Sequence, residues 1–178
     1  PDLTVLGKII THGFPSSGAV AGRREVMQAC TGSFGDKVFM GGTLAANPIS
    51  TAACYHALRL MEKYDAVAKA SAFAEKITQA LNDLFATRPD LGFFVYNYGP
   101  IIHYVTTAFF SVELSAPDAF TELMARKQVA DDYQLVTMSH GLCSLAGTRM
   151  YTCMQHDDEA MQRTLRVWEY LLSLIPEN

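Results

Sequence analysis

The chain has 178 residues, 49% of them hydrophobic, and its 10 Phe, 8 Tyr and 8 Met are ample material for a packed core, which excludes a disordered chain. Its 14 Lys and Arg residues against 18 Asp and Glu residues leave a formal charge of -4 without a basic stripe, which argues against a nucleic-acid partner. No run of 18 apolar residues indicates a membrane span, and the start lacks the pattern of a signal peptide, so we expect a cytoplasmic protein.

The first third of the chain alternates short apolar segments with loops rich in Gly, Pro and Ser. The pattern predicts a buried strand over residues 3–10, a loop over 11–18, a strand over 19–22 and a short helix over 23–30. Asn47 is placed to cap a helix that has Pro48 at its first position and reaches about Tyr64. Spacings of three and four predict one apolar face on this helix, made by Ile49, Ala52, Ala53, His56, Leu60 and Met61.

The remainder begins with a second helix over residues 65–86, which Pro89 closes. Two antiparallel strands over 92–99 and 101–114 follow, then a helix from Asp118 to about Tyr133, a short strand over 135–138 and a third strand over 149–154. The last helix is predicted from Asp157 to about Ile175. Its expected inward residues are Met161, Leu165, Trp168, Leu172 and Ile175.

These elements predict two parts that meet near Tyr64. Residues 1–64 have the loops of an α/β fold, and residues 65–178 form a small α+β layer of about three strands with helices on one face. The chain enters an apolar run within two residues of Pro1, and such a run needs neighbours to bury it. We therefore expect it to be the carboxyl-terminal part of a longer protein.

Lys8 is conspicuous because it interrupts the apolar run over residues 3–10. A lysine there can extend its ammonium to water or mark an exposed strand edge. Partial desolvation would instead favour the neutral amine, which can attack a carbonyl and form a Schiff base. Position alone leaves these alternatives open.

The segment "GGTLAANP", residues 41–48, places two glycines and a threonine hydroxyl before a helix amino terminus. Backbone N–H groups and a hydroxyl in this arrangement can hold a phosphate. The alternative is an ordinary capped helix start with tight-turn glycines.

Read together, "PDLTVLGKII", "GFPSSGAVAGRREVM" and "GGTLAANPISTAACYHAL" closely resemble the class III aminotransferases that depend on pyridoxal phosphate, especially the branch with glutamate semialdehyde aminomutase. The resemblance implies the carboxyl-terminal part of a fold type I enzyme, with the end of the large α/β domain over 1–64 and the small α+β domain over 65–178. It also implies a homodimer with its active site at the interface.

By this resemblance Lys8 is the Schiff-base lysine and the catalytic proton carrier. Thr43 would hydrogen-bond the phosphate of the neighbouring subunit's cofactor, and Gly42 and Asn47 would shape that loop. The implied reaction is amino-group transfer from a small amino compound to a keto or aldehyde acceptor. An intramolecular aminomutase of the glutamate semialdehyde type and a non-catalytic relative kept for assembly are the alternatives.

Two further residues are candidates for contact with the substrate. Arg149 precedes an acidic helix start, the place where many class III enzymes hold an arginine that pairs with a substrate carboxylate, or it makes a structural ion pair. His12 lies in the loop after Lys8, where it would touch substrate or be polar surface. The sequence shows no metal-ligand spacing around His103 or His140.

The resemblance places two parts of the cofactor site upstream of Lys8: the aspartate that keeps the cofactor's ring nitrogen protonated, and a Ser- or Gly-rich turn for the phosphate. Asp2 is too close along the strand to be that aspartate, and Asp36 lies in a loop. We therefore expect an incomplete enzyme that needs the amino-terminal portion of the same protein.

Overall fold

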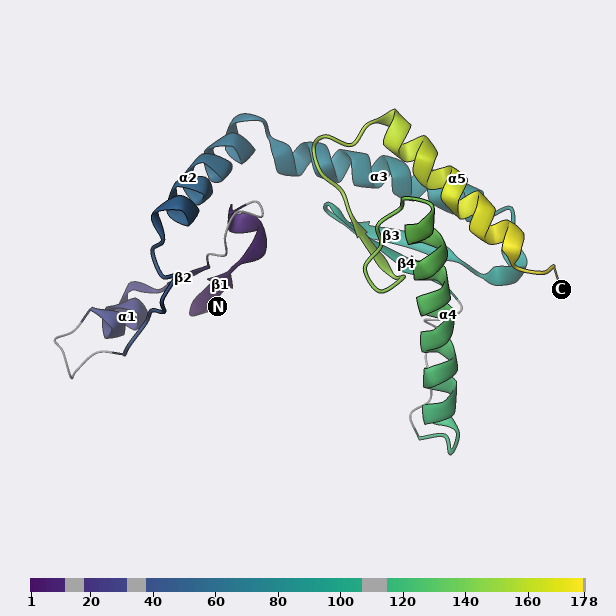
Figure 1. The fold of residues 1–178 in the computed structure, drawn as a ribbon, viewed down its shortest axis with the longest axis horizontal. Helices are drawn as coiled ribbons and strands as arrows, with labels where there is room; N and C mark the ends of the chain where they lie inside the picture. The colour runs from purple at the N-terminus through teal and green to yellow at the C-terminus, as the bar shows by residue number, and fades with distance from the viewer. Residues whose placement is uncertain (12–17, 32–37, 107–114, 178) are drawn as a thin grey trace. The chain divides into compact units, whose positions relative to one another are not determined.

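The computed structural model describes residues 1–11, 18–31, 38–106 and 115–177, and the chain divides into two compact units, Pro1–Tyr64 and Asp65–Asn178. His12 and Asp36, both considered above, lie outside the described residues. Figure 1 shows the elements of each unit in chain order.

The first unit begins with an antiparallel strand pair and ends with a long helix. Its elements are β1 (Leu3–Leu6), η1 (Lys8–Thr11), β2 (Ala19–Gly22), α1 (Arg24–Met27), η2 (Gln28–Cys30) and α2 (Pro48–Lys63). Leu3 pairs with Gly22 and Leu6 with Ala19, and η1 packs against α2. The predicted strand over residues 19–22, short helix after it and long helix from Pro48 are confirmed.

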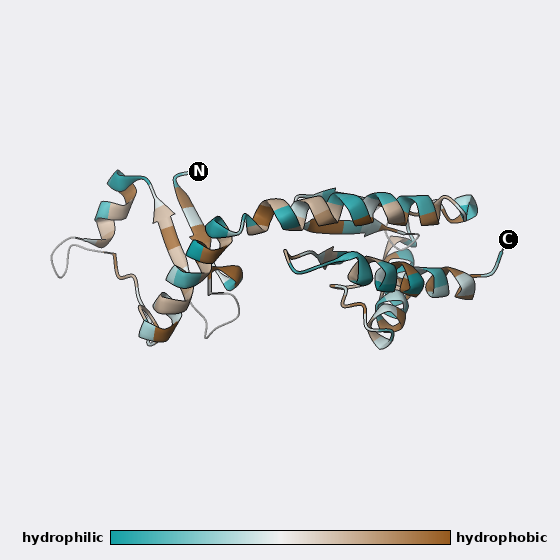
Figure 2. Ribbon diagram, turned by 90° about the horizontal axis from the view of Figure 1, so that it is seen from above, coloured by the Kyte–Doolittle hydropathy of each residue, from teal (hydrophilic) through white to brown (hydrophobic). Residues whose placement is uncertain are grey.

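The prediction of a buried strand over residues 3–10 is wrong in length and in burial. The strand ends at Leu6, and the chain turns into the 3-10 helix η1 at Lys8. Val5 is 79% exposed, because β1 has one partner strand and α2 packs on η1. Figure 2 shows the apolar colouring of this strand pair beside the labelled amino terminus.

The predicted apolar face of α2 is also partly wrong. Ser50 and Ala57 are the buried residues of this helix, whereas Ile49 is 63% exposed and Leu60 is 48% exposed. Apolar side chains occur on several sides of α2, so the spacing of these residues did not specify which side would be buried. The contact with η1 determines which side is covered.

The second unit is a three-stranded antiparallel sheet, in the order β3-β4-β5, with helices packed on it. Its elements are α3 (Ala66–Phe85), η3 (Pro89–Leu91), β3 (Phe94–Tyr98), β4 (Ile101–Val105), α4 (Ala119–Ser139), β5 (Arg149–Tyr151) and α5 (Asp158–Leu174). In Figure 1, α3 and α5 lie together, and both contribute to one core with the sheet. The three predicted strands are therefore found, although β4 ends at Val105 and residues 107–114 of the strand predicted over 101–114 lie outside the described residues.

The core of this unit forms between the sheet and the helices, because alternate residues of each strand lie on one face of the sheet and residues three or four apart lie on one side of each helix. Val95 opposes Tyr104 and Ile102 opposes Met150 across the sheet, and all four are buried. The core also holds Ala74, Ile77, Leu81, Phe85, Leu91, Phe93, Trp168, Leu171 and Leu172. The predicted inward residues of the last helix are confirmed, since each is buried or packs against this core.

The predicted short strand over residues 135–138 is wrong, because α4 continues as a helix to Ser139. Val136 packs against the core, and the buried Thr137 hydroxyl lies 3.1 Å from Ser144 Oγ. Tertiary packing thus overrides the strand preference of these β-branched residues.

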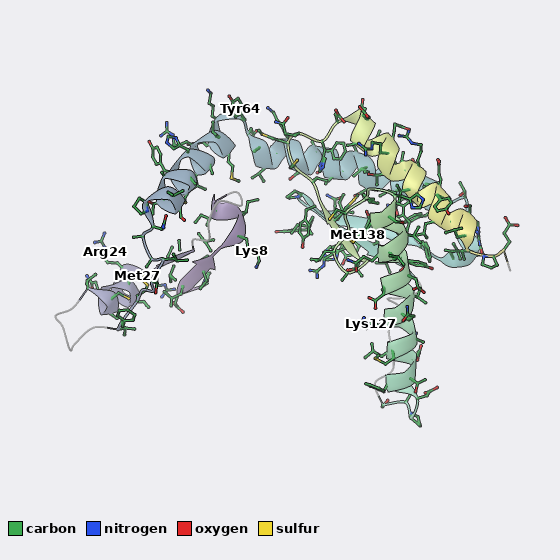
Figure 3. The ribbon with its side chains drawn as sticks, viewed as in Figure 1. Lys8, Arg24, Met27, Tyr64, Lys127 and Met138 are labelled. Carbon is green, nitrogen blue, oxygen red and sulfur yellow. The ribbon has the colours of Figure 1, made fainter. Side chains whose placement is uncertain are left out.

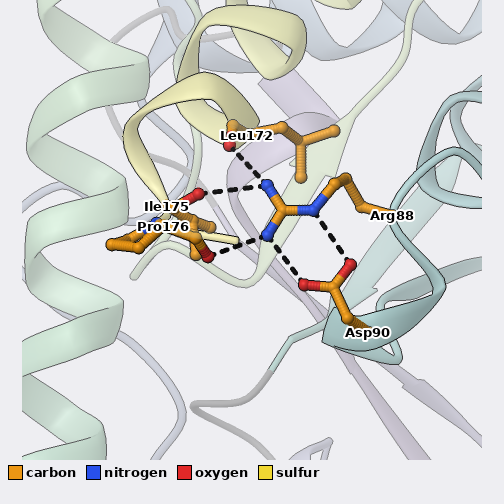
Figure 4. A network of polar contacts seen from close by, with 5 residues as sticks. All are labelled: Arg88, Asp90, Leu172, Ile175 and Pro176. Carbon is orange, nitrogen blue, oxygen red and sulfur yellow. Dashed lines mark hydrogen bonds and ion pairs between the residues drawn. The ribbon is translucent and has the colours of Figure 1, made fainter. Parts of the chain in front are cut away.

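One polar cluster closes the carboxyl end of α5 (Figure 4). Arg88 forms an ion pair with Asp90 and donates to the backbone carbonyls of Leu172, Ile175 and Pro176. The Asp90 carboxylate raises the pKa of Arg88, and the hydrogen bond from Arg88 lowers the pKa of Asp90. Arg88 thus adds a side-chain donor to Leu172 O, which also accepts from Ile175 N, and to the two carbonyls that follow the helix.

Candidate functional site

Lys8 stands at the first residue of η1, directly after the strand β1 (Figure 3). Its φ angle of 52° lies in the left-handed region, which is uncommon for a residue with a Cβ. A hydrogen bond from Ile10 N to Gly7 O, 3.4 Å, closes the turn. The turn takes Lys8 out of the β ladder and leaves its side chain exposed, which agrees with the first of the two alternatives, a lysine that extends to water, and not with partial desolvation.

Gly42 and Thr43 lie in a tight turn that leads into α2. Ala45 N donates to Gly42 O at 2.9 Å, and Asn47 N donates to Leu44 O at 3.2 Å. The Thr43 side chain is exposed and forms no hydrogen bond with any residue that the structure describes. Its hydroxyl is therefore available to a ligand.

Asn47 anchors that turn as the predicted helix cap. Its Oδ1 accepts from Ile49 N at 3.0 Å and from Ser50 N at 3.3 Å, and Pro48 occupies the first helical position. These bonds stabilise a helix amino terminus immediately after the Gly42–Thr43 turn.

Arg149, in contrast, belongs to the second unit, where it begins β5. It pairs with His103 of β4, which in turn pairs with Tyr96 of β3. The rings of Tyr96 and His103 stack with centroids 5.2 Å apart. Because residues directly opposite in antiparallel strands share a face, these three side chains form one row across the sheet.

The guanidinium of Arg149 has no ion pair or hydrogen bond with the described residues, so the structural ion pair considered above is not found among them. Sequence analysis weighed His103 as a metal ligand and did not predict its position beside Arg149, because the strand register that pairs the two residues is a tertiary property.

The first unit offers two kinds of group that pyridoxal phosphate needs, an exposed primary amine at Lys8 and an exposed hydroxyl at Thr43. It does not supply a buried carboxylate for the ring nitrogen among its described residues, since Asp2, Glu25 and Glu62 are all exposed. Asp2 is also engaged, with its Oδ1 3.2 Å from Arg23 Nη1. The residues present thus fit the aldehyde and phosphate ends of this group.

Other kinds of site receive no support from the described part of the chain. It contains no group of three His, Cys, Asp or Glu residues able to hold a metal ion. None of its helices combines the length and the apolar character needed to cross a membrane.

Several known proteins resemble the chain. Glutamate-1-semialdehyde 2,1-aminomutase from Francisella philomiragia is 31% identical over 168 residues, covering 93% of this chain and 37% of that protein. The protein of that name from Caldivirga maquilingensis is 43% identical over 83 residues, covering 47% of this chain and 19% of that protein. The chain thus spans well under half the length of the curated relatives it matches.

Solved structures share its fold at lower identity. An omega-transaminase from Sphaerobacter thermophilus matches with a TM-score of 0.75 at 22% identity, covering 97% of this chain and 38% of that chain. A transaminase with PLP bound matches with a TM-score of 0.77 at 21% identity and the same coverage. The predicted fold class, the carboxyl-terminal part of a fold type I transferase, is confirmed.

The sequence model of the family described as aminotransferase class-III matches residues 1–93, which include Lys8, Gly42 and Thr43. The match takes in more than half of the 178 residues. The chain therefore belongs to the aminotransferase class-III family.

Proposed function

We propose that the chain supplies the lysine and a phosphate contact of a pyridoxal phosphate enzyme that transfers an amino group from an amino compound to a keto or aldehyde substrate. The supporting observation is the left-handed, exposed turn at Lys8 within the segment that the family match covers. Strained backbone of this kind is concentrated at functional sites. The first unit would be the end of the large domain and the second unit the small domain.

In this proposal Lys8 acts through its Nζ atom. An exposed amine can bond covalently to the cofactor's aldehyde, and once released it can take a proton from the substrate carbon and return it elsewhere. The bound cofactor supplies an electron sink for that carbon. Lys8 is thus both the attachment point and the proton carrier.

The turn before α2 would hold the phosphate end. Thr43 donates its hydroxyl, Gly42 keeps the turn free of a side chain, and Asn47 holds the helix start in place. The family resemblance assigns this contact to the cofactor of the neighbouring subunit. We therefore propose a homodimer in which each active site draws on both copies, within a cytoplasmic enzyme.

Arg149 and His12 are the proposed substrate contacts. A guanidinium without a partner among the described residues, such as that of Arg149, suits a bidentate pair with a substrate carboxylate. His12 follows the η1 turn by one residue, so a role beside the Lys8 amine fits its place in the chain.

A second candidate is an aminomutase, which moves the amino group within one molecule of a semialdehyde. It is favoured by the names of the relatives above 30% identity, which are glutamate-1-semialdehyde 2,1-aminomutases. The two reactions differ in whether a second keto acid is consumed. Isomerisation of a single amino-aldehyde substrate without an acceptor would decide for the aminomutase.

The proposal is tested by borohydride reduction of the chain together with the amino-terminal portion of its protein, in the presence of pyridoxal phosphate. We expect a reduced pyridoxyl adduct on the peptide that contains Lys8, and loss of both adduct and activity in Lys8→Ala. Lys63→Ala is the matched control, because Lys63 is an exposed lysine of the same unit. Absence of both the Lys8 adduct and amino-group transfer in the unsubstituted protein would instead identify a non-catalytic relative.

A further inference from the structure

The second unit contains a cavity of about 350 Å³ that the proposed reaction does not use. It lies among α3, the end of α4, β5 and the first half of α5. This volume is at the lower end of the range of small-molecule sites in proteins. The cavity is thus large enough for one small organic ligand.

The lining of this cavity combines an apolar floor with a polar rim that includes the Arg163 guanidinium. Ile77, Met150 and Val167 are buried in the floor, while Arg163 and His156 are exposed at the rim. No Asp or Glu lines the cavity. Its charge therefore favours an anion, and its floor favours an apolar body attached to that anion.

Arg163 is available to such an anion. Its guanidinium makes no ion pair or hydrogen bond with any residue in the described ranges. Its Nη2 lies next to the turn at Gly141, since a Cβ built on that glycine would be 3.8 Å away. The guanidinium therefore sits at the cavity wall with its donors unused.

His156 offers a second donor because its tautomer is determined by the backbone. Cys153 N donates to His156 Nδ1 at 3.0 Å, so Nδ1 is the accepting nitrogen and the hydrogen of the neutral ring is on Nε2. The ring lies 5.3 Å from that of Phe73, centroid to centroid. It is thus held by contacts on two sides.

The two threonine hydroxyls of the lining are engaged within the protein, and the lining also includes Tyr151 and His140. Thr152 Oγ1 donates to the carbonyls of Ala70 and Pro100, and Thr164 Oγ1 donates to that of Ala160. Arg163 thus carries the fixed positive charge of the lining, and His156 offers an N–H donor.

We propose that this cavity is a binding site for a small monocarboxylate with an apolar body. The carboxylate pairs with the Arg163 guanidinium and accepts from His156 Nε2, and the apolar body covers Ile77, Met150 and Val167. All of its lining residues belong to the second unit, and none of them is a residue proposed above to contact the cofactor.

The test is calorimetric titration of the full 178-residue chain with 4-phenylbutyrate, and with 4-phenylbutanol and inorganic phosphate as probes that lack the charge or the apolar body. We expect saturable binding of 4-phenylbutyrate alone. Arg163→Gln should weaken it by about tenfold or more, because a charge-assisted pair is lost. Arg166→Gln on the same helix, exposed and outside the cavity, should leave it unchanged.

Equal binding of the alcohol would overturn the role of the charge, and equal binding of phosphate would overturn that of the apolar floor. An unchanged affinity in Arg163→Gln would overturn the site itself. Amide NMR shifts of Gly141 and His156 in the unsubstituted chain give a second test that no variant's folding can affect. Saturable shifts there support the site, and their absence refutes it.

Discussion

Asn82 joins α3 to the edge strand β3 by a reciprocal pair of hydrogen bonds. Its Nδ2 donates to Val95 O at 2.9 Å, and its Oδ1 accepts from Val95 N at 2.8 Å. Val95 is 3% exposed, and its strand has β4 as its one partner in the sheet. Asn82→Ala would therefore leave a buried N–H and C=O without partners.

The magnitude follows from those two bonds. Each contributes roughly 1 kcal/mol net, and leaving buried polar groups unpaired costs roughly 1–3 kcal/mol more. We expect the free energy of unfolding of the second unit to fall by about 3–5 kcal/mol. With a urea dependence of about 2 kcal/mol per molar, the unfolding midpoint should fall by about 1.5–2.5 M.

Trp168 is the fluorescent probe for this measurement, because it is the single tryptophan of the chain and is 1% exposed in the core of this unit. Urea unfolding is followed by its fluorescence. Glu75→Ala is the matched control on the same helix, since Glu75 is exposed and forms no hydrogen bond with a described residue. Equal midpoints for Asn82→Ala and Glu75→Ala would refute the reasoning.

Three further predictions concern capping, ionisation and the cofactor. Asn47→Ala should cost about 1 kcal/mol of α2 stability and reduce far-UV helix signal, because two backbone N–H groups lose their acceptor. Burial raises the pKa of Tyr104, so the folded state favours the neutral phenol. The free energy of unfolding should therefore be constant below about pH 10, where an exposed tyrosine ionises, and fall as the pH rises further. Absorbance at 295 nm should show one tyrosine that ionises only on unfolding. The 178 residues alone should bind pyridoxal phosphate weakly or not at all, and full occupancy on borohydride reduction would contradict this.

The acid dependence of the α5 terminus is a consequence of the same linkage. The hydrogen bond from Arg88 lowers the pKa of Asp90, so the stabilisation is present above about pH 4 and is lost as pH falls further. In Asp90→Asn, the midpoint of thermal unfolding, followed by Trp168 fluorescence, should fall less steeply below about pH 4 than in the unsubstituted chain. An equally steep fall in both proteins would show that other carboxylates cause the acid dependence.

Much of the local structure was predictable because it depends on neighbours in the chain. Asn47 followed by Pro48 specifies a helix start by itself, since the side chain reaches backbone N–H groups two and three residues on. The inward stripe of α5 followed from helical periodicity, and the three strands from β-branched and aromatic composition. The segments around Lys8 and Thr43 indicated the family to which the chain belongs.

Other features were decided only by tertiary structure. Residues 135–138 have strand preferences but remain helical, because Thr137 and Val136 find partners outside their own segment. The row of Tyr96, His103 and Arg149 depends on strand register, and the cavity beside Arg163 depends on four elements meeting. The sequence alone determined the helix start at Asn47, the inward stripe of α5 and the family that the chain resembles, because those signals lie between near neighbours. Which face is buried and which distant side chains meet depended on packing between elements, which no local pattern encodes.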